Sequence, residues 1–330
     1  MSLNLYPDLI HTPDLTPEFP PEIDEACDAI RKATKGFGTS EKKLIKAMAV
    51  GPAERTLISI RYEQTKGKAL EDLMKKECGG DFGEALRLLA LPPDAADARI
   101  LKMATDGIGA SKKYIYPVVC GRSNEEIEIL KKTYYKKYGK DLSGILQSEL
   151  GGDFERLVIE SIQGVEEGFD PGYHTQEKAQ EDAETFYEAG QGRWGTNEKK
   201  LIKILVASPP EHLRNINQEY AEKYGYTLTK ALEKELGGAL EEAALFVLGM
   251  KLKPFETVAD LIKQSCAGVG TDEMLLTACI VRYQSILPQV MVAHMEMFGK
   301  SVQDRVKKET GGDYEKLLLA LLNRAIPDDA

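Results

Sequence analysis

The sequence of 330 residues predicts an all-α protein made of four similar units. Three observations predict this fold class: an internal repeat, apolar residues that recur three and four positions apart, and no strand-like alternation. The string E-x-G-G-[DA]-[FYL] begins four times, at Glu77, Glu149, Glu235 and Glu309. A glycine-rich break precedes each string, and its last glycine lies 39, 40, 40 or 39 residues before the glutamate. This nearly constant spacing predicts four copies of one structural unit.

Each unit is predicted to hold several short helices: one before the glycine-rich break, two or three between the break and the glutamate, and one after it. The segments EKKLIKAMAV and EKKLIKILVA, which follow the first and third breaks, carry apolar residues on one helical face. The last helix opens with Asp81, Asp153 or Asp313, which we expect to cap it. The third unit has Ala239 at this position and lacks the cap.

The connections between units predict the domain organisation. We place the units at residues 24–92, 96–166, 180–252 and 257–327. Residues 1–23 form a proline-rich tail, and prolines at 7, 13, 17, 20 and 21 exclude a continuous helix there. Residues 167–179 form a linker between the second and third units that is longer than the other connections. This suggests two halves, in which the first unit pairs with the second and the third with the fourth.

The composition indicates an acidic globular protein. Lys and Arg number 43 against 53 Asp and Glu, and the formal net charge of −10 argues against nucleic-acid binding. The five cysteines are odd in number and widely spaced, so we expect reduced thiols in a cytoplasmic protein. The N-terminus has no signal-peptide pattern, and no segment approaches the roughly 20 apolar residues that span a bilayer.

The glycine-rich breaks and the distant glutamates together suggest a calcium site. In KGFGT, at residues 35–39, two glycines can adopt backbone conformations closed to other residues and turn carbonyl oxygens toward one point. If the helices bring the distant glutamate back to the loop, it would add two carboxylate oxygens, and this hard-oxygen set suits Ca²⁺. The set is incomplete, which leaves coordination positions for water or a phosphate oxygen. No EF-hand loop occurs in the sequence.

An alternative explains each break as a plain connection between two helices, with Thr39, Thr196 or Thr271 capping the second helix. One isolated break would favour this alternative. Four breaks with a matched acid favour ligation, because a turn does not need a glutamate 39 or 40 residues later. The aspartates that follow the paired glycines are explained by helix capping alone.

These motifs resemble those of the annexins, and the resemblance extends over residues 24–327 through the K-G-x-G-T…E signature. It implies a curved disc of four five-helix repeats that binds Ca²⁺ on its convex face and, through Ca²⁺, anionic phospholipids. It also implies three carbonyl ligands and one glutamate in each repeat. These residues are Thr34, Gly36, Gly38 and Glu77; Thr105, Gly107, Gly109 and Glu149; Gly190, Arg193, Gly195 and Glu235; and Cys266, Gly268, Gly270 and Glu309.

The second loop departs from the family pattern, with Asp106 where lysine is usual and Ala110 where threonine is usual. This weakens the expected helix cap and puts calcium affinity there in doubt. The resemblance also places residues at the loop tips that can contact a membrane. They are Phe37, Ile108, Trp194, Val269 and Lys35. It further suggests a polar channel lined by Asp97, Arg122 and Arg282, for which buried ion pairs are the simpler account.

The predicted function is calcium-dependent, reversible binding to anionic membranes, such as those that contain phosphatidylserine. The main alternative is a calcium-independent helical-repeat scaffold that binds proteins. Catalysis is not expected, because the four histidines are scattered and no H-E-x-x-H, G-x-S-x-G or phosphate-loop motif occurs. We expect a cytoplasmic protein that becomes peripheral on membranes when calcium rises. Self-association on membranes and a protein partner for the tail are left open.

Overall fold

The structure is a computed structural model that describes residues 3–12, 17–36, 38–107, 109–191, 195–268 and 270–326. Within these ranges the chain forms α-helices, one short 3-10 helix and loops, and no strand. The predicted all-α class is confirmed. No single helix among them is long and apolar enough to cross a bilayer, although the bent pair at residues 273–282 and 284–298 has the length and composition to do so.

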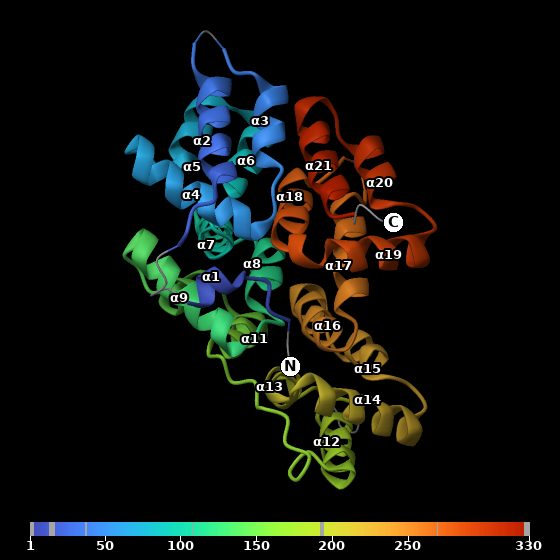
Figure 1. The fold of residues 1–330 in the computed structure, drawn as a ribbon. Coiled ribbons are helices and arrows are strands. Elements are labelled where there is room, and N and C mark those ends of the chain that lie inside the picture. Colours follow the sequence, from blue (N-terminus) through green and yellow to red (C-terminus); the bar gives the residue numbers. More distant parts are fainter. Residues whose placement is uncertain are drawn as a thin grey trace. The chain divides into compact units, whose positions relative to one another are not determined.

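Each repeat contributes five consecutive α-helices (Figure 1). A short α1 (Asp8–His11) lies in the tail. The first repeat contains α2 (Pro21–Thr34), α3 (Glu41–Met48), α4 (Pro52–Lys66), α5 (Leu70–Glu77) and α6 (Gly80–Leu89). The second contains α7 (Pro93–Thr105), α8 (Lys112–Val119), α9 (Asn124–Tyr138), α10 (Leu142–Glu149) and α11 (Gly152–Ile162). The third contains α12 (Gln176–Ala189), α13 (Glu198–Ala207), α14 (Pro210–Tyr224), α15 (Leu228–Glu235) and α16 (Gly238–Leu252). The fourth contains α17 (Pro254–Ser265), α18 (Glu273–Arg282), η1 (Gln284–Ile286), α19 (Leu287–Phe298), α20 (Val302–Glu309) and α21 (Gly312–Arg324).

The helices form because apolar residues lie on one face and glycines end the helices at equivalent places. In α2, for example, Ile23, Cys27, Ile30 and Ala33 are buried, at spacings of three and four residues. Helices α4, α9, α14 and α19 each end at a glycine in the left-handed conformation, a common way to stop a helix. The same stop signal therefore recurs in all four repeats.

The last helix of each repeat begins at the second of the paired glycines and has no aspartate cap. Its N-cap is the first glycine, and no side chain hydrogen-bonds to the cap. The second glycine has a φ between 58° and 67° in every repeat, a left-handed conformation outside the α-helical region, and the right-handed turn follows directly after it. The expectation that Asp81, Asp153 and Asp313 cap these helices is wrong. They lie in the first helical turn, where a negative charge is favourable near the helix N-terminus.

The repeats pack into two compact units. One unit comprises Leu5–Arg99 with Val258–Ala330, and the other comprises Met1–Asn4 with Ile100–Thr257. The first repeat therefore packs with the fourth, through contacts of α3 and α6 with α18 and α21, and the second packs with the third, through contacts of α8 and α11 with α13 and α16. The expected pairing in chain order is wrong, because the length of a linker limits its reach but does not decide which apolar faces meet.

The charged residues suggested to line a channel are buried and paired within their own units. Asp97 accepts hydrogen bonds from Arg282 Nε at 2.5 Å and from the Tyr6 hydroxyl at 3.0 Å. The tail residue Tyr6 is itself buried. In the other unit, Arg122 pairs with Glu126 at 2.5 Å. Such pairs compensate the charges that these side chains bring into the core.

Candidate metal centres in the glycine-rich loops

Four loops join the first and second helices of the repeats, and the same backbone hydrogen bond closes each of them. In every case the amide of the residue that precedes the second helix donates to a carbonyl in the last turn of the first helix. The pairs are Ser40 to Ala33 at 2.8 Å, Ser111 to Ala104 at 2.8 Å, Asn197 to Ala189 at 2.6 Å and Asp272 to Ser265 at 2.7 Å. The closure fixes both ends of the loop that carries the predicted ligands.

In the first, second and fourth loops both predicted ligand glycines have left-handed backbone conformations. Their φ angles are 115° and 89° at Gly36 and Gly38, 107° and 83° at Gly107 and Gly109, and 95° and 92° at Gly268 and Gly270. A Cβ added at any of them would meet nothing within 4 Å. Backbone conformation, and not lack of space, therefore requires glycine at these positions.

A threonine hydroxyl connects the loop to the distant glutamate in three repeats. Thr39 Oγ1 donates to the backbone carbonyl of Glu77 at 3.3 Å, and Thr271 Oγ1 donates to that of Glu309 at 3.0 Å. In the third repeat Thr196 donates to a carboxylate oxygen at 2.8 Å instead. The structure thus brings together the two motifs that lie 39 or 40 residues apart in the sequence.

These threonines do not cap the following helices, which corrects the expectation from the sequence. The N-caps are the next residues along the chain, Ser40, Asn197 and Asp272. Asn197 and Asp272 accept backbone hydrogen bonds from Lys200 and Leu275 in the usual manner. The threonine hydroxyl is consequently available for the glutamate.

The second repeat lacks this connection because Ala110 replaces the threonine. Its two glycines still have left-handed φ angles like those of the first and fourth loops. Glu149 is exposed, whereas the other three glutamates are partly buried. The second site therefore has the same loop backbone but a less constrained carboxylate.

The third loop is one residue longer and lies close against its glutamate. A Cβ at Gly190 would lie 2.9 Å from Glu235 Cγ, so this position needs glycine for space. Thr196 binds one carboxylate oxygen of Glu235, and the Gln191 side chain binds the other. The sequence reasoning missed Gln191. Its only signal was its place next to the longer glycine break. Arg193, a predicted ligand, lies outside the described residues, as do the predicted membrane-contact residues Phe37, Ile108, Trp194 and Val269.

The carboxylates of the first and fourth repeats have nearly identical surroundings. The Glu77 side chain is 20% exposed and its Oε1 lies 2.9 Å from Lys76 Nζ. The Glu309 side chain is 21% exposed and its Oε1 lies 3.3 Å from Lys308 Nζ. Both lysines are mainly in solvent, and such surface pairs contribute little to stability. The two carboxylates are therefore held by the fold and remain within reach of solvent.

The donor chemistry of the loops fits a hard cation such as Ca²⁺. Each predicted set combines backbone carbonyl oxygens with one carboxylate, and oxygen ligands are those that Ca²⁺ prefers. Within the described part of the chain, no three His, Cys, Asp or Glu side chains cluster to hold a metal. Cys266 would contribute only its carbonyl, since burial raises the pKa of its thiol and keeps the sulfur neutral.

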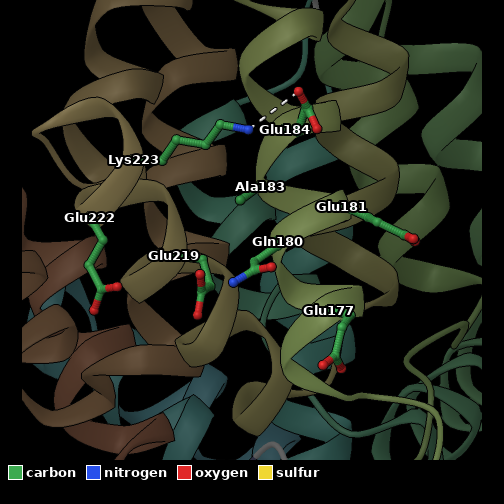
Figure 2. A pocket seen from close by; sticks show the side chains of 8 residues that line it. All are labelled: Glu177, Gln180, Glu181, Ala183, Glu184, Glu219, Glu222 and Lys223. Atoms are coloured by element: carbon green, nitrogen blue, oxygen red, sulfur yellow. Dashed lines mark ion pairs between the residues drawn. The ribbon is translucent and has the colours of Figure 1, made fainter.

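A cavity of about 590 Å³ lies away from these ligands, between α12 and α14. Figure 2 shows its acidic lining, which includes Glu177, Glu219 and Glu222, and the ion pair of Lys223 with Glu184. None of the predicted calcium ligands lines it. It is an acidic surface groove separate from the loops.

Comparisons with known proteins agree with the repeat architecture. A family model described as Annexin matches residues 25–89, 96–160, 181–247 and 257–321, and each segment contains one glycine-rich loop and its glutamate. Annexin A13 of Homo sapiens is 32% identical over 306 residues, which cover 92% of this chain and 96% of that protein. The solved structure of annexin III has a TM-score of 0.85 and 28% identity, and covers 93% of this chain and 95% of its own. Chicken annexin V in complex with Zn²⁺ has a TM-score of 0.83 and 29% identity, with 93% and 97% covered.

Proposed function

Since the chain belongs to the annexin family, which is generally known for calcium-dependent phospholipid binding, we propose that it binds anionic membranes reversibly when Ca²⁺ is present. One observation carries the proposal. In the first, third and fourth repeats a loop threonine is hydrogen-bonded to the glutamate that the sequence places 38 or 39 residues later. A loop that only joined two helices would not need that acid.

The proposed ligands are the loop carbonyls and the glutamate of each repeat. The first and fourth repeats have the strongest support, through Thr34, Gly36, Gly38 and Glu77 and through Cys266, Gly268, Gly270 and Glu309. The second site, at Thr105, Gly107, Gly109 and Glu149, is proposed to be weaker for lack of the hydroxyl. The third uses Gly190, Arg193, Gly195 and Glu235, where Gln191 or Thr196 has to release a carboxylate oxygen.

Bound Ca²⁺ supplies positive charge and open coordination positions for the phosphate oxygens of a lipid. The chain itself is acidic, with a net charge of −10, and is repelled by an anionic leaflet in the absence of the cation. The loop tips Phe37, Ile108, Trp194 and Val269, with Lys35 beside them, are proposed to contact the headgroup region. Several weak sites then add up by multivalency, and calcium removal releases the protein.

The experiment that tests the proposal is sedimentation of the full chain with lipid vesicles. Vesicles of phosphatidylserine and phosphatidylcholine are compared with vesicles of phosphatidylcholine alone, each in Ca²⁺ and in EGTA. We expect the protein in the pellet only when phosphatidylserine and Ca²⁺ are both present. Absence from every pellet would reject the proposal and favour the protein-binding scaffold, and equal pelleting in EGTA would reject the role of calcium.

A further inference from the structure

A second cavity, of about 340 Å³, lies between α12 and α13 in the third repeat. We call it the α12–α13 groove. Helix α12 contributes Lys178 and Asp182 to its wall, α13 contributes Lys200 and Lys203, and the first turn of α14 contributes His212. The linker before α12 completes the wall. None of the described calcium ligands of the third repeat lines the groove, so it is a separate feature.

The acidic groups of the groove already have partners. Asp182 lies 2.6 Å from Lys178 Nζ and 2.8 Å from His212 Nε2. Glu167 of the linker lies 3.3 Å from His174 Nε2. These pairs account for both carboxylates in the wall and for one of its three lysines.

Two lysines of the groove remain without an ion pair in the described part of the chain. Lys200 and Lys203 are exposed, and their spacing of three residues places both ammonium groups on one side of α13. Lys203 also acts at longer range on Glu160, whose pKa is raised by burial and partly lowered again by Arg156, Lys199 and Lys203. The groove therefore carries an excess of positive charge on a protein that is acidic overall.

His212 adds a buried polar atom that has no partner in the described structure. Its side chain is only 2% exposed, and its Nδ1 makes no hydrogen bond there. An unsatisfied buried polar atom is unfavourable, so a ligand group that reached it would gain from the contact. Because Nε2 is taken by Asp182, the neutral ring offers Nδ1 as an acceptor to a ligand hydroxyl, and the protonated ring offers it as a donor to an anion.

We propose that the α12–α13 groove binds, without calcium, a small molecule that carries one to three phosphate groups. Lys200 and Lys203 would donate to one phosphate, a role for which the compact lysine ammonium is well suited. The volume is near the lower end of the range for small-ligand pockets, roughly 300–1,000 Å³, and so fits a phosphorylated sugar or headgroup and not a peptide. Tyr173, 54% exposed in the groove wall, would cover the uncharged part of the ligand.

The test is isothermal titration of the full chain in EGTA with inositol 1,4,5-trisphosphate and, separately, with inorganic pyrophosphate. We expect one site per chain, and affinity weakened by about tenfold or more in the double variant Lys200→Gln/Lys203→Gln, because each lost bond joins charged groups. The matched control is Lys199→Gln/Lys307→Gln, which removes two exposed lysines outside the groove and should bind like the original chain. A second variant, Ala207→Phe, fills the groove without a charge change and should weaken binding at least as strongly.

Failure of both probes to bind, or equal weakening in the two double-lysine variants, would overturn the proposal. Binding of the probes that occurs in Ca²⁺ and not in EGTA would also overturn the proposal. A further arm uses vesicles that contain phosphatidylinositol 4,5-bisphosphate in EGTA. Pelleting that depends on Lys200 and Lys203 would identify a lipid headgroup as the source of the phosphate, whereas binding of the soluble probe alone would identify a free metabolite. All arms in EGTA are independent of the calcium-dependent function, so either proposal can fail without the other.

Discussion

Three threonine hydroxyls connect the glycine-rich loops to glutamates that are remote in the sequence. Thr39 and Thr271 bind the glutamate backbone, and Thr196 binds the carboxylate itself. A net contribution of about 0.5–1.5 kcal/mol per hydrogen bond is small for folding, but the bond holds the loop next to the glutamate of the proposed ligand set. At the scale of single residues, the loop and the acid therefore form one structural feature.

The acceptor of such a hydroxyl is the kind of detail that a single sequence does not reveal. Threonine just before a helix is a common cap, and the same residue can bond across to another segment. Which acceptor the hydroxyl bonds to depends on where α5, α15 and α20 place the glutamate relative to the loop. That placement is set by tertiary packing. The glycines were predictable because their conformation is local, and the glutamates because of their repeated spacing.

Asp182 gives a residue-scale prediction about pH. Burial alone would raise the pKa of this carboxyl, but hydrogen bonds from His212 and Lys178 outweigh burial, and the pKa lies below its ordinary value of 3.8. A lowered folded-state pKa means that the charged carboxylate stabilises the fold above the unfolded pKa, and that this contribution is lost as pH falls through the folded pKa. We expect Asp182→Asn to lower the free energy of unfolding by about 2 kcal/mol at pH 7.

Urea unfolding of both proteins between pH 7 and pH 3 measures this difference. It should stay constant down to about pH 5 and shrink below about pH 4, as the original chain loses the contribution that the variant never had. A difference that stays unchanged at pH 3, or that grows there, would contradict this role for the Asp182 carboxylate.

At the scale of elements, the four loops share most of their local structure. All four are closed by the same backbone hydrogen bond, and three share the left-handed glycine pair. The second loop keeps this backbone and lacks only the hydroxyl, because it has Ala110. Replacing the Ala110 methyl group by the hydroxyethyl group of threonine therefore measures what the hydroxyl contributes to the second loop.

We expect Ala110→Thr to strengthen calcium binding at the second loop by about twofold to tenfold, the equivalent of one net hydrogen bond. The substitution is made in a background of Glu77→Gln, Glu235→Gln and Glu309→Gln, so that only the second site retains its acid. Ala110→Val is the matched control, with threonine's shape and no hydroxyl. Calcium titration with phosphatidylserine vesicles gives the affinities. Equal behaviour of the threonine and valine variants would show that the hydroxyl has no part in the site.

The helices themselves were largely predictable, and the starts of the last helices were not. Apolar spacing marks the helical faces, as in α2, and the glycine stops after α4, α9, α14 and α19 lie where the pattern ends. The paired glycines misled the prediction because the first is the N-cap and the second, with its left-handed φ, leads directly into the first turn, so the aspartate lies inside the helix. A sequence pattern alone does not show which glycine has that conformation.

At the scale of the whole molecule, chain order and packing order differ. The first and fourth repeats share one compact unit, and the second and third share the other. The α12–α13 groove could not be predicted from the sequence for the same reason. Its wall combines a linker and three helices, and its paired residues Asp182 and His212 lie 30 residues apart. Repeats and ligand types follow from local pattern, whereas pairing and cavities follow from which faces become buried.

Under the proposed function, the acidic balance of the molecule makes the loops decisive for its encounter with a membrane. With a net charge of −10 the chain has no electrostatic reason to approach an anionic surface without a cation. Four carboxylates, one in each repeat, are the only side-chain ligands in the proposed sets. Their joint removal tests the central claim while leaving the helices intact.

The most direct measurement is the calcium dependence of sedimentation with phosphatidylserine vesicles for the variant Glu77→Gln/Glu149→Gln/Glu235→Gln/Glu309→Gln. The matched control replaces four exposed helical glutamates, Glu25, Glu63, Glu222 and Glu296, by glutamine and changes the net charge equally. The account predicts that the control pellets at the same calcium concentration as the original chain and that the loop variant needs at least about tenfold more. A loop variant that pellets with the original calcium midpoint would contradict the account.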